Sequence, residues 1–340
     1  MLDALKPLAK KILETRDMVA ENAAAIRSSA GVPEEFEEKN LVFSVGKSVP
    51  NFSVCAVDGG LLADRLVGSD IVIMRSVAVN FVYRNSRLET VRHHPKKFPE
   101  PEVGFMNGLD EHEAMVFRSL FRLKGEIAAA TEALEKFKPD YLLLDGSIVL
   151  LGSDKPGEGS LLSEDYKELL KTYKTLYHKC ETQNCQLAGV IKDSRGKRLA
   201  DLLRDQLVVD VSDTVLADAL LGESERTSVL GYTNDAAKHP VLTSLGEWAG
   251  KIKLFYLRPS ASDSPLRIEF VKSKKAVDEI AADICSLCSI SKAFAYPAIL
   301  VEADMCAALM PTEMEKIKSS LFVMTGGATR PLRRAERPFR

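Results

Sequence analysis

Positions 141–147 read Tyr141-Leu142-Leu143-Leu144-Asp145-Gly146-Ser147. The apolar run has the length of a buried strand, and the glycine after the aspartate frees the backbone. A second stretch has the same form, because residues 52–57 predict a short strand that ends in Asp58-Gly59-Gly60. Ligand sites in open α/β sheets form at the carboxyl ends of strands. Two such aspartates on neighbouring strands could share a divalent metal, although each Asp-Gly pair is also compatible with a simple turn.

The segment between the two aspartates supplies a third candidate ligand. Residues 71–79 are rich in β-branched side chains and predict a strand, which residues 81–84 either extend or follow. Residues 110–137 carry apolar side chains at helical spacing and predict a long helix. Glu126 flanks the apolar stripe of this helix, where it could reach the sheet edge or remain solvated. Glu113 competes with it, but an acidic residue in the first turn is expected from the helix dipole alone.

The rest of the chain alternates helices and strands. Further helices are predicted at 1–30, 163–179, 198–221, 275–289 and after Pro297 to about residue 309, and further strands at 186–191, 253–257 and 267–271. The order is strand with Asp, hairpin strands, helix with Glu, strand with Asp, and a late helix. This order predicts an α/β fold with an RNase H-like mixed sheet flanked by helices, with N-terminal and inserted helical elements. In such domains carboxylates hold two metal ions about 3.5–4 Å apart.

Composition sets broad limits on the function. The chain has 340 residues, is 46% hydrophobic and 28% charged, and carries a formal net charge of −2. That excludes an obviously basic nucleic-acid coat, but not an enzyme that acts on nucleic acid. We expect no membrane span, no signal peptide and a cytoplasmic protein with reduced cysteines. The sequence has no Walker A pattern, which disfavours a P-loop ATPase.

Basic side chains gather in residues 84–101. The candidates for DNA phosphate contacts are Arg84, Arg87, Arg92, Lys96 and Lys97. The three prolines of this segment predict an irregular loop, and a merely solvated loop is the alternative. The arginine-rich residues 326–340 could contact phosphates too, or be a disordered tail.

Histidine and cysteine pairs are the other candidate metal ligands. His93 and His94 are neighbours on an extended segment and should point apart. Cys285-x-x-Cys288 together with Cys180 and Cys185 suggests zinc, but buried free thiols are the better interpretation because the first pair lies in an apolar helical pattern.

The ordered motifs resemble the NurA family of archaeal and bacterial nucleases over about residues 40–310. The resemblance rests on Ala56-Val57-Asp58-Gly59-Gly60, Arg122-x-x-x-Glu126, Leu142-Leu143-Leu144-Asp145-Gly146-Ser147, Val190-Ile191-Lys192-Asp193-Ser194 and Tyr296-Pro297-x-x-Leu300-x-x-Ala303. It implies a Mn²⁺-dependent (or Mg²⁺-dependent) 5′-to-3′ exonuclease and single-strand endonuclease acting on single- and double-stranded DNA ends. It also implies a homodimer that works with the hexameric HerA translocase in DNA end resection during double-strand break repair.

The resemblance also assigns site residues. It implies that Asp58, Glu126 and Asp145 are catalytic metal ligands, that Lys192 lies near the scissile phosphate, and that Tyr296 belongs to the catalytic set. One departure concerns the position eight residues after Tyr296, where the family usually has His and this chain has Asp304. Asp304 is an acceptable, harder ligand for a second metal, and we favour that role over a lost one.

Two other functions remain open at this point. A catalytically altered DNA-end adaptor for the translocase is suggested by Asp304 in place of His. An actin-like ATPase also begins with a strand followed by Asp-Gly, although its second phosphate loop should be richer in glycine than Asp145-Gly146-Ser147. Because the candidate ligands span residues 58–304, we expect one nuclease domain at 41–325. A helical extension at 1–40 and a basic, flexible tail at 326–340 would flank it.

Overall fold

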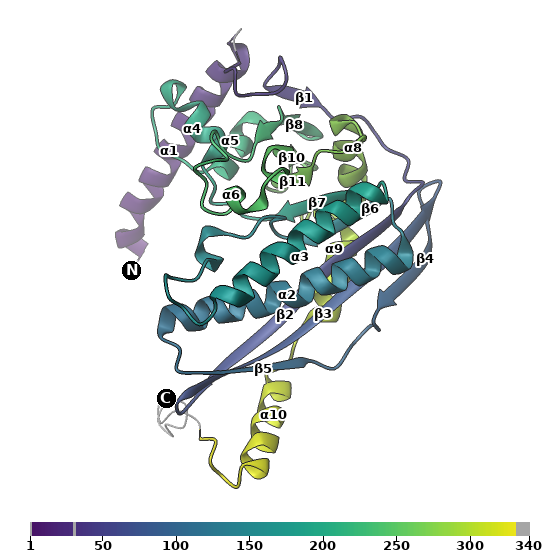
Figure 1. The fold of residues 1–340 in the computed structure, drawn as a ribbon. Helices are drawn as coiled ribbons and strands as arrows, with labels where there is room; N and C mark the ends of the chain where they lie inside the picture. The colour runs from purple at the N-terminus through teal and green to yellow at the C-terminus, as the bar shows by residue number, and fades with distance from the viewer. Residues whose placement is uncertain (1, 30–31, 331–340) are drawn as a thin grey trace.

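The computed structural model describes residues 2–29 and 32–330 (Figure 1). Within these residues, eleven strands form one mixed sheet in the order β1-β8-β10-β11-β7-β6-β2-β3-β4, with β5 beside β3 and β9 beside β10. The strands are β1 (Val42–Ser44), β2 (Ser53–Leu66), β3 (Ser69–Arg84), β4 (Arg87–His94), β5 (Glu102–Asn107), β6 (Tyr141–Asp145), β7 (Gln186–Ile191), β8 (Glu225–Thr227), β9 (Leu230–Gly231), β10 (Ile252–Arg258) and β11 (Leu266–Val271).

Helices precede, interrupt and follow these strands. They are α1 (Leu2–Ser28), α2 (Glu111–Phe137), α3 (Ser163–Thr182), α4 (Arg198–Leu202), α5 (Asp213–Leu220), α6 (Leu242–Leu245), α7 (Trp248–Lys251), α8 (Val277–Leu287), α9 (Ala298–Ala307) and α10 (Pro311–Met324), with 3₁₀ turns at Gly152–Asp154 and Arg204–Gln206. Among the described residues, no helix is both long enough and apolar enough to cross a membrane.

The strand order confirms the predicted RNase H-like arrangement. Strands β2, β3 and β4 form an antiparallel meander, α2 then crosses the sheet, and β6 returns parallel to β2. Strand β7 pairs parallel to β6 and joins the core to the antiparallel strands β11, β10, β8 and β1. A parallel pair needs a crossover connection. The 27-residue helix α2 follows β5 and lies in the connection that brings the chain back to β6 beside β2.

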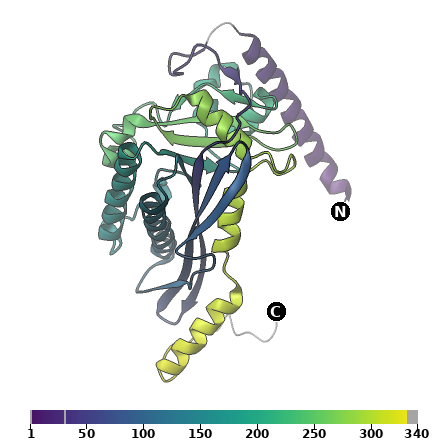
Figure 2. The ribbon, with the colours of Figure 1, turned by 90° about the vertical axis from the view of Figure 1, so that its right-hand side faces the viewer.

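Helices cover both faces of the central strands. Helices α2 and α3 lie on one face and α8 and α9 on the other, as the side view shows (Figure 2). The predicted stripe of α2 is buried in the first of these layers, including Leu120, Ile127 and Leu134. The sequence also encodes the ends of α2. Asp110 forms a capping box with Glu113, and Lys138 closes the helix in the left-handed conformation before Pro139. Glu113 therefore has the structural role expected of its position.

Several predicted elements have different limits. Strand β2 does not stop before Asp58 but continues to Leu66, and residues 81–84 extend β3. The segment 84–101 is not an irregular loop, because β3 and β4 form a hairpin that turns at Asn85 and Ser86, both with positive φ. The prolines lie beyond this hairpin. The predicted helix at 198–221 is broken into α4, a 3₁₀ turn and α5, and α10 was not predicted.

Helix α1 packs against the rest of the protein only through its C-terminal half. Val19, Ala23 and Ile26 are buried, whereas Leu5, Leu8 and Ile12 are each about half exposed. The two cysteine pairs lie in different cores. Cys180 in α3 and Cys185 belong to one core, and Cys285 and Cys288 at the end of α8 belong to the other. Most of the predicted basic tail, residues 331–340, lies outside the described residues.

Candidate active site

Asp58 and Asp145 lie on adjacent parallel strands. Val57 pairs with Leu144 in the last step of the β2–β6 ladder, so each aspartate is the next residue along its strand. Strand β6 ends at Asp145, and Gly146 turns the chain with a φ of 126°. Strand β2 runs on, now paired with β3 alone. The two carboxylates therefore meet where the parallel pairing stops.

Glycines beside Asp58 let two helices approach the sheet. A Cβ atom on Gly59 would lie 2.6 Å from Oε1 of Glu126, and a Cβ on Gly60 would lie 2.2 Å from the carbonyl oxygen of Ala307. Successive residues of a strand face opposite sides of the sheet. The Asp58-Gly59-Gly60 motif thus brings Glu126 of α2 against one face and the end of α9 against the other.

Asp304 of α9 reaches Asp58. The two side chains are hydrogen-bond neighbours, and Asp145 adds a further negative charge. Burial, followed by the Asp145 carboxylate and by Asp304, raises the pKa of Asp58 to about 7 against the opposing effect of the Gly59 N–H. Asp304, which stands where the family usually has His, therefore belongs to the same cluster as Asp58.

Glu126 is buried, with 8% of its surface exposed, and so is not a solvated flank. Burial raises the pKa of Glu126 to about 8, and the charges of Asp58 and Asp145 add to this shift. Arg122, one helical turn earlier, opposes the shift by donating to Oε1 of Glu126 at 2.5 Å. The Arg122–Glu126 motif is thus an i,i+4 ion pair that holds the glutamate against the cluster.

Two side chains donate hydrogen bonds to Asp145. Tyr296, which precedes α9, donates its hydroxyl to Oδ1 at 2.9 Å, and Lys192, after β7, donates to Oδ2 at 3.2 Å. The Lys192 ammonium also lies 4.0 Å from the centre of the Tyr296 ring. Burial and the Asp145 charge raise the pKa of Tyr296 far above its ordinary value, so it remains a hydroxyl donor.

The chemistry of these residues suits a divalent metal. Carboxylates of four elements converge: Asp58 from β2, Glu126 from α2, Asp145 from β6 and Asp304 from α9. Burial raises the pKa of Asp58 and of Glu126, and the like charges of the neighbouring carboxylates raise both further. Oxygen ligands of this kind suit Mg²⁺ and Mn²⁺, and a bound cation would relieve the repulsion.

The predicted DNA-binding residues do not form one group. Arg84 and Arg87 face each other at the turn of the β3–β4 hairpin. Near that turn, Val82 of β3 pairs with Ser53 of β2, and Asp58 lies five residues further along β2, which is about 17 Å of extended strand. Lys97 lies closer to the site, since its ammonium is 3.0 Å from Glu302 on α9. The two histidines point apart, with His93 at Glu302 and His94 at Glu132.

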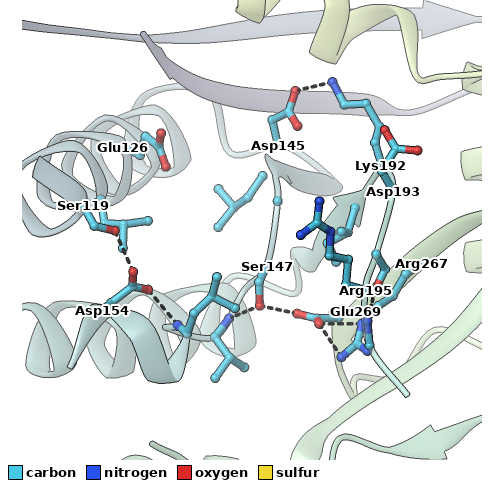
Figure 3. A pocket seen from close by; sticks show the side chains of 18 of the residues that line it. Ser119, Glu126, Asp145, Ser147, Asp154, Lys192, Asp193, Arg195, Arg267 and Glu269 are labelled. Carbon is cyan, nitrogen blue, oxygen red and sulfur yellow. Dashed lines mark hydrogen bonds and ion pairs between the residues drawn. The ribbon is translucent and has the colours of Figure 1, made fainter. Parts of the chain in front are cut away.

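A cavity of about 540 Å³ adjoins the carboxylates (Figure 3). Sequence reasoning missed several polar residues that line it, namely Arg195, Arg267 and Glu269. Their signal was present but weak. Arg267 and Glu269 are charged residues spaced by two in an otherwise apolar strand, which places both on one face of β11.

Comparisons with known proteins point to one family of nucleases. A family model, the NurA domain, matches residues 52–309. The crystal structure of the NurA nuclease from Sulfolobus solfataricus has a TM-score of 0.61 at 17% identity, over 96% of this chain and 95% of that chain. A crystal structure of NurA bound to dAMP and manganese has a TM-score of 0.55 at 13% identity, over 94% and 96%. No curated protein matches the sequence.

At these identities the solved structures establish a shared fold. The family match covers most of the chain and includes all four carboxylates of the cluster. The chain therefore belongs to the NurA family of nucleases.

Proposed function

We propose that this protein is a metal-dependent DNA nuclease that hydrolyses phosphodiester bonds. The observation that carries the proposal is the meeting of Asp58, Glu126, Asp145 and Asp304 at one end of the β2–β6 ladder. Scattered acidic residues would not converge from two strands and two helices. The family match supports the same activity.

The proposed cofactor is Mn²⁺ or Mg²⁺, in a two-metal site. Asp58, Glu126, Asp145 and Asp304 would hold it, and manganese is present in a NurA structure of the same fold. Bound divalent cations supply a Lewis acid for the phosphate and lower the pKa of bound water.

The surrounding side chains orient the ligands and the substrate. Tyr296 holds one oxygen of Asp145 by donating its hydroxyl, and so positions that carboxylate. Lys192 contacts the other oxygen and is partly exposed, which leaves its charge available to a phosphate. Arg122 fixes Glu126 through their ion pair.

DNA would approach along basic surfaces of the same molecule. Lys96 and Lys97 follow β4 near α9, and Arg84, Arg87 and Arg92 lie on the exposed hairpin. Such contacts supply affinity that is independent of sequence and depends on salt. We assign these five residues to DNA backbone contacts.

The finer activity follows the family resemblance. We propose 5′-to-3′ exonuclease and single-strand endonuclease activity in end resection, as a homodimer with a HerA-type hexameric translocase in the cytoplasm. The exposed apolar side chains Leu5, Leu8 and Ile12 on α1 give a surface for such protein contacts.

The DNA-end adaptor is the second candidate. Asp304 in place of the usual His suggests an adaptor if this position has lost its role. Because Asp304 lies at hydrogen-bonding range of Asp58, the geometry favours a retained ligand and hence the nuclease. The family match gives no support to the actin-like ATPase.

End-labelled single- and double-stranded DNA tests the proposal, with Mn²⁺, Mg²⁺ or EDTA. The wild type should cleave with a divalent metal and stop in EDTA, and the Asp58→Ala variant should not cleave. Binding of DNA without cleavage under any divalent metal would support the adaptor instead. Unchanged cleavage by Asp58→Ala would reject the proposed site.

A further inference from the structure

A histidine, a glutamate and a cysteine meet between β4 and α9, outside the carboxylate cluster. His93 lies near the end of β4, and Glu302 and Cys306 lie one turn apart on α9. Nε2 of His93 is 3.0 Å from Oε1 of Glu302, and Sγ of Cys306 is 3.6 Å from the same oxygen. One ligand atom from each residue lies within 4.8 Å of the other two. The fold thus brings a nitrogen, an oxygen and a sulfur together from segments 209 residues apart.

This group is separate from the carboxylate cluster, although both use α9. In a helix with about 3.6 residues per turn, residues four apart share a face, and a residue two positions away lies about 200° round the axis. Glu302 and Cys306 therefore lie on one face of α9. Asp304 lies on the opposite side, where it meets Asp58.

The spacing of the three ligand atoms is close to that of a tetrahedral zinc site. Bonds of about 2.0–2.3 Å from zinc to nitrogen, oxygen and sulfur put the ligand atoms about 3.3–3.7 Å apart. The distance from Cys306 to Oε1 of Glu302 falls within this range, and the distance from His93 is slightly shorter. Zinc accepts all three kinds of donor, whereas Mg²⁺ and Mn²⁺ favour oxygen ligands. The donor set therefore selects zinc over the harder cations.

Burial and charge also suit a zinc ion. Cys306 is fully buried, and the side chains of His93 and Glu302 are 16% and 24% exposed, so the group is sheltered but open on one side. On binding, the Cys306 thiol releases its proton to solvent, and the thiolate and the Glu302 carboxylate balance the charge of the cation. The ammonium of Lys97 occupies the open side, 3.0 Å from Oε1 of Glu302. Because the Lys97 side chain is half exposed, it can move into solvent when a metal binds.

We propose that His93, Glu302 and Cys306 form a zinc site, with water as the fourth ligand in place of the Lys97 ammonium. Because its ligands come from β4 and α9, the zinc ion fastens this strand to the helix that carries Asp304. The site is independent of the nuclease function proposed above, which uses other ligands and harder cations. The alternative is an ion-pair network without metal, in which Lys97 and His93 only hold Glu302 in place.

Cobalt binding tests this proposal, because a cobalt–thiolate bond gives a charge-transfer band in the near ultraviolet that oxygen ligands do not give. Co²⁺ is titrated into the metal-free full chain with excess Mg²⁺, which binds oxygen ligands and not thiolates. The wild type should show the band, and added Zn²⁺ should remove it. Cys306→Ser should lose the band, and Glu302→Gln and His93→Gln should each bind Co²⁺ at least about tenfold more weakly. Lys97→Ala should bind it about fivefold more tightly, because the ammonium no longer competes.

Two matched controls isolate the proposed ligands. Cys285→Ser replaces the partly exposed cysteine of α8, and His94→Gln replaces the neighbouring histidine, which contacts Glu132 instead. Both should bind Co²⁺ within about twofold of the wild type. His93 and Glu302 are partly exposed, so their glutamine variants should fold even if the buried Cys306→Ser does not.

The absence of the band in the wild type, or its persistence in a folded Cys306→Ser, would overturn the proposal and favour the metal-free network. Wild-type affinity in both His93→Gln and Glu302→Gln would overturn it as well, as would unchanged affinity in Lys97→Ala. Because the readout is a cobalt–sulfur bond, these results are independent of whether the protein cleaves DNA.

Discussion

Asp58 and Asp145 look alike in sequence and differ in structure. Each follows an apolar run and precedes a glycine. Asp145 ends β6 and is followed by a turn, whereas Asp58 lies within the 14-residue strand β2. What they share is the point at which the β2–β6 pairing stops. The comparison teaches that the motif marks the end of a parallel ladder, and not necessarily the end of a strand.

The surroundings of the two aspartates also differ. Asp145 is held by the Tyr296 hydroxyl and the Lys192 ammonium. Asp58 receives a hydrogen bond from the Gly59 N–H at 2.7 Å and otherwise faces the carboxylates of Asp145 and Asp304. One carboxylate is oriented and compensated by the protein, and the other is left to be compensated by a cation. The predictions below test this division.

The largest effect is expected from removing either charge. Asp58→Asn and Asp145→Asn should each lower Mn²⁺-dependent cleavage of labelled DNA at least about a hundredfold, since both would ligate the cation that stabilises the transition state. The control is Asp64→Asn on the same strand as Asp58, where Asp64 pairs with Lys318. Cleavage by Asp58→Asn at the wild-type rate would contradict the account.

A smaller loss is expected from the residue that orients Asp145. Tyr296→Phe removes the hydroxyl that donates to Asp145 and keeps the ring under Lys192. The rate constant for cleavage should fall about tenfold, in the range seen for partners of metal ligands. Its pH profile should keep its shape, because the raised pKa of Tyr296 excludes it as a base. Tyr83→Phe, in β3, should behave like the wild type.

Stability without metal should depend on pH through Asp58. Its pKa of about 7 lies above the ordinary 3.8, so the folded state retains a proton that the unfolded state releases. The free energy of unfolding should therefore fall as pH rises from about 4 to about 7. Glu126, with a pKa of about 8, extends the decline. Thermal unfolding in EDTA should show a shallower decline for Asp58→Asn, and Mn²⁺ should stabilise the wild type more at pH 8 than at pH 5. Equal slopes for both proteins would place the effect elsewhere.

The smallest effect is expected far from both aspartates. Arg84 lies at the exposed turn of the β3–β4 hairpin. Arg84→Ala should weaken DNA binding by no more than a few fold and lower the slope of log K against log salt concentration by about one. Binding measured across a salt series checks this. An unchanged slope would remove Arg84 from the DNA path.

Local patterns predicted the parts of the fold in which local and tertiary forces agree. The strand at Tyr141–Asp145 and the helix at Glu111–Phe137 follow from apolar periodicity and capping residues, and both were predicted within one residue. The order of these elements predicted the sheet arrangement. It made Asp58, Glu126 and Asp145 candidates for one site, but it left a simple turn and a solvated flank open as alternatives. Asp304 joined them because α9 packs on β2.

Other features depend on contacts that sequence patterns do not reveal. Gly59 and Gly60 suggest a turn locally, but their missing side chains serve the close packing of Glu126 and Ala307 on a continuing strand. The prolines of residues 84–101 led to the prediction of an irregular loop, but they follow a regular strand, Arg87–His94. Arg195 belongs to an ordinary polar loop in the sequence, and its place in the lining of the cavity depends on the tertiary structure.

Direct titration of Mn²⁺ into the metal-free protein tests the central claim, that the carboxylates around Asp58 form a metal site. Calorimetry at pH 8 should show binding to the wild type and to the Asp64→Asn control. Binding to Asp58→Asn should be at least about tenfold weaker. Wild-type Mn²⁺ affinity in Asp58→Asn would contradict the claim.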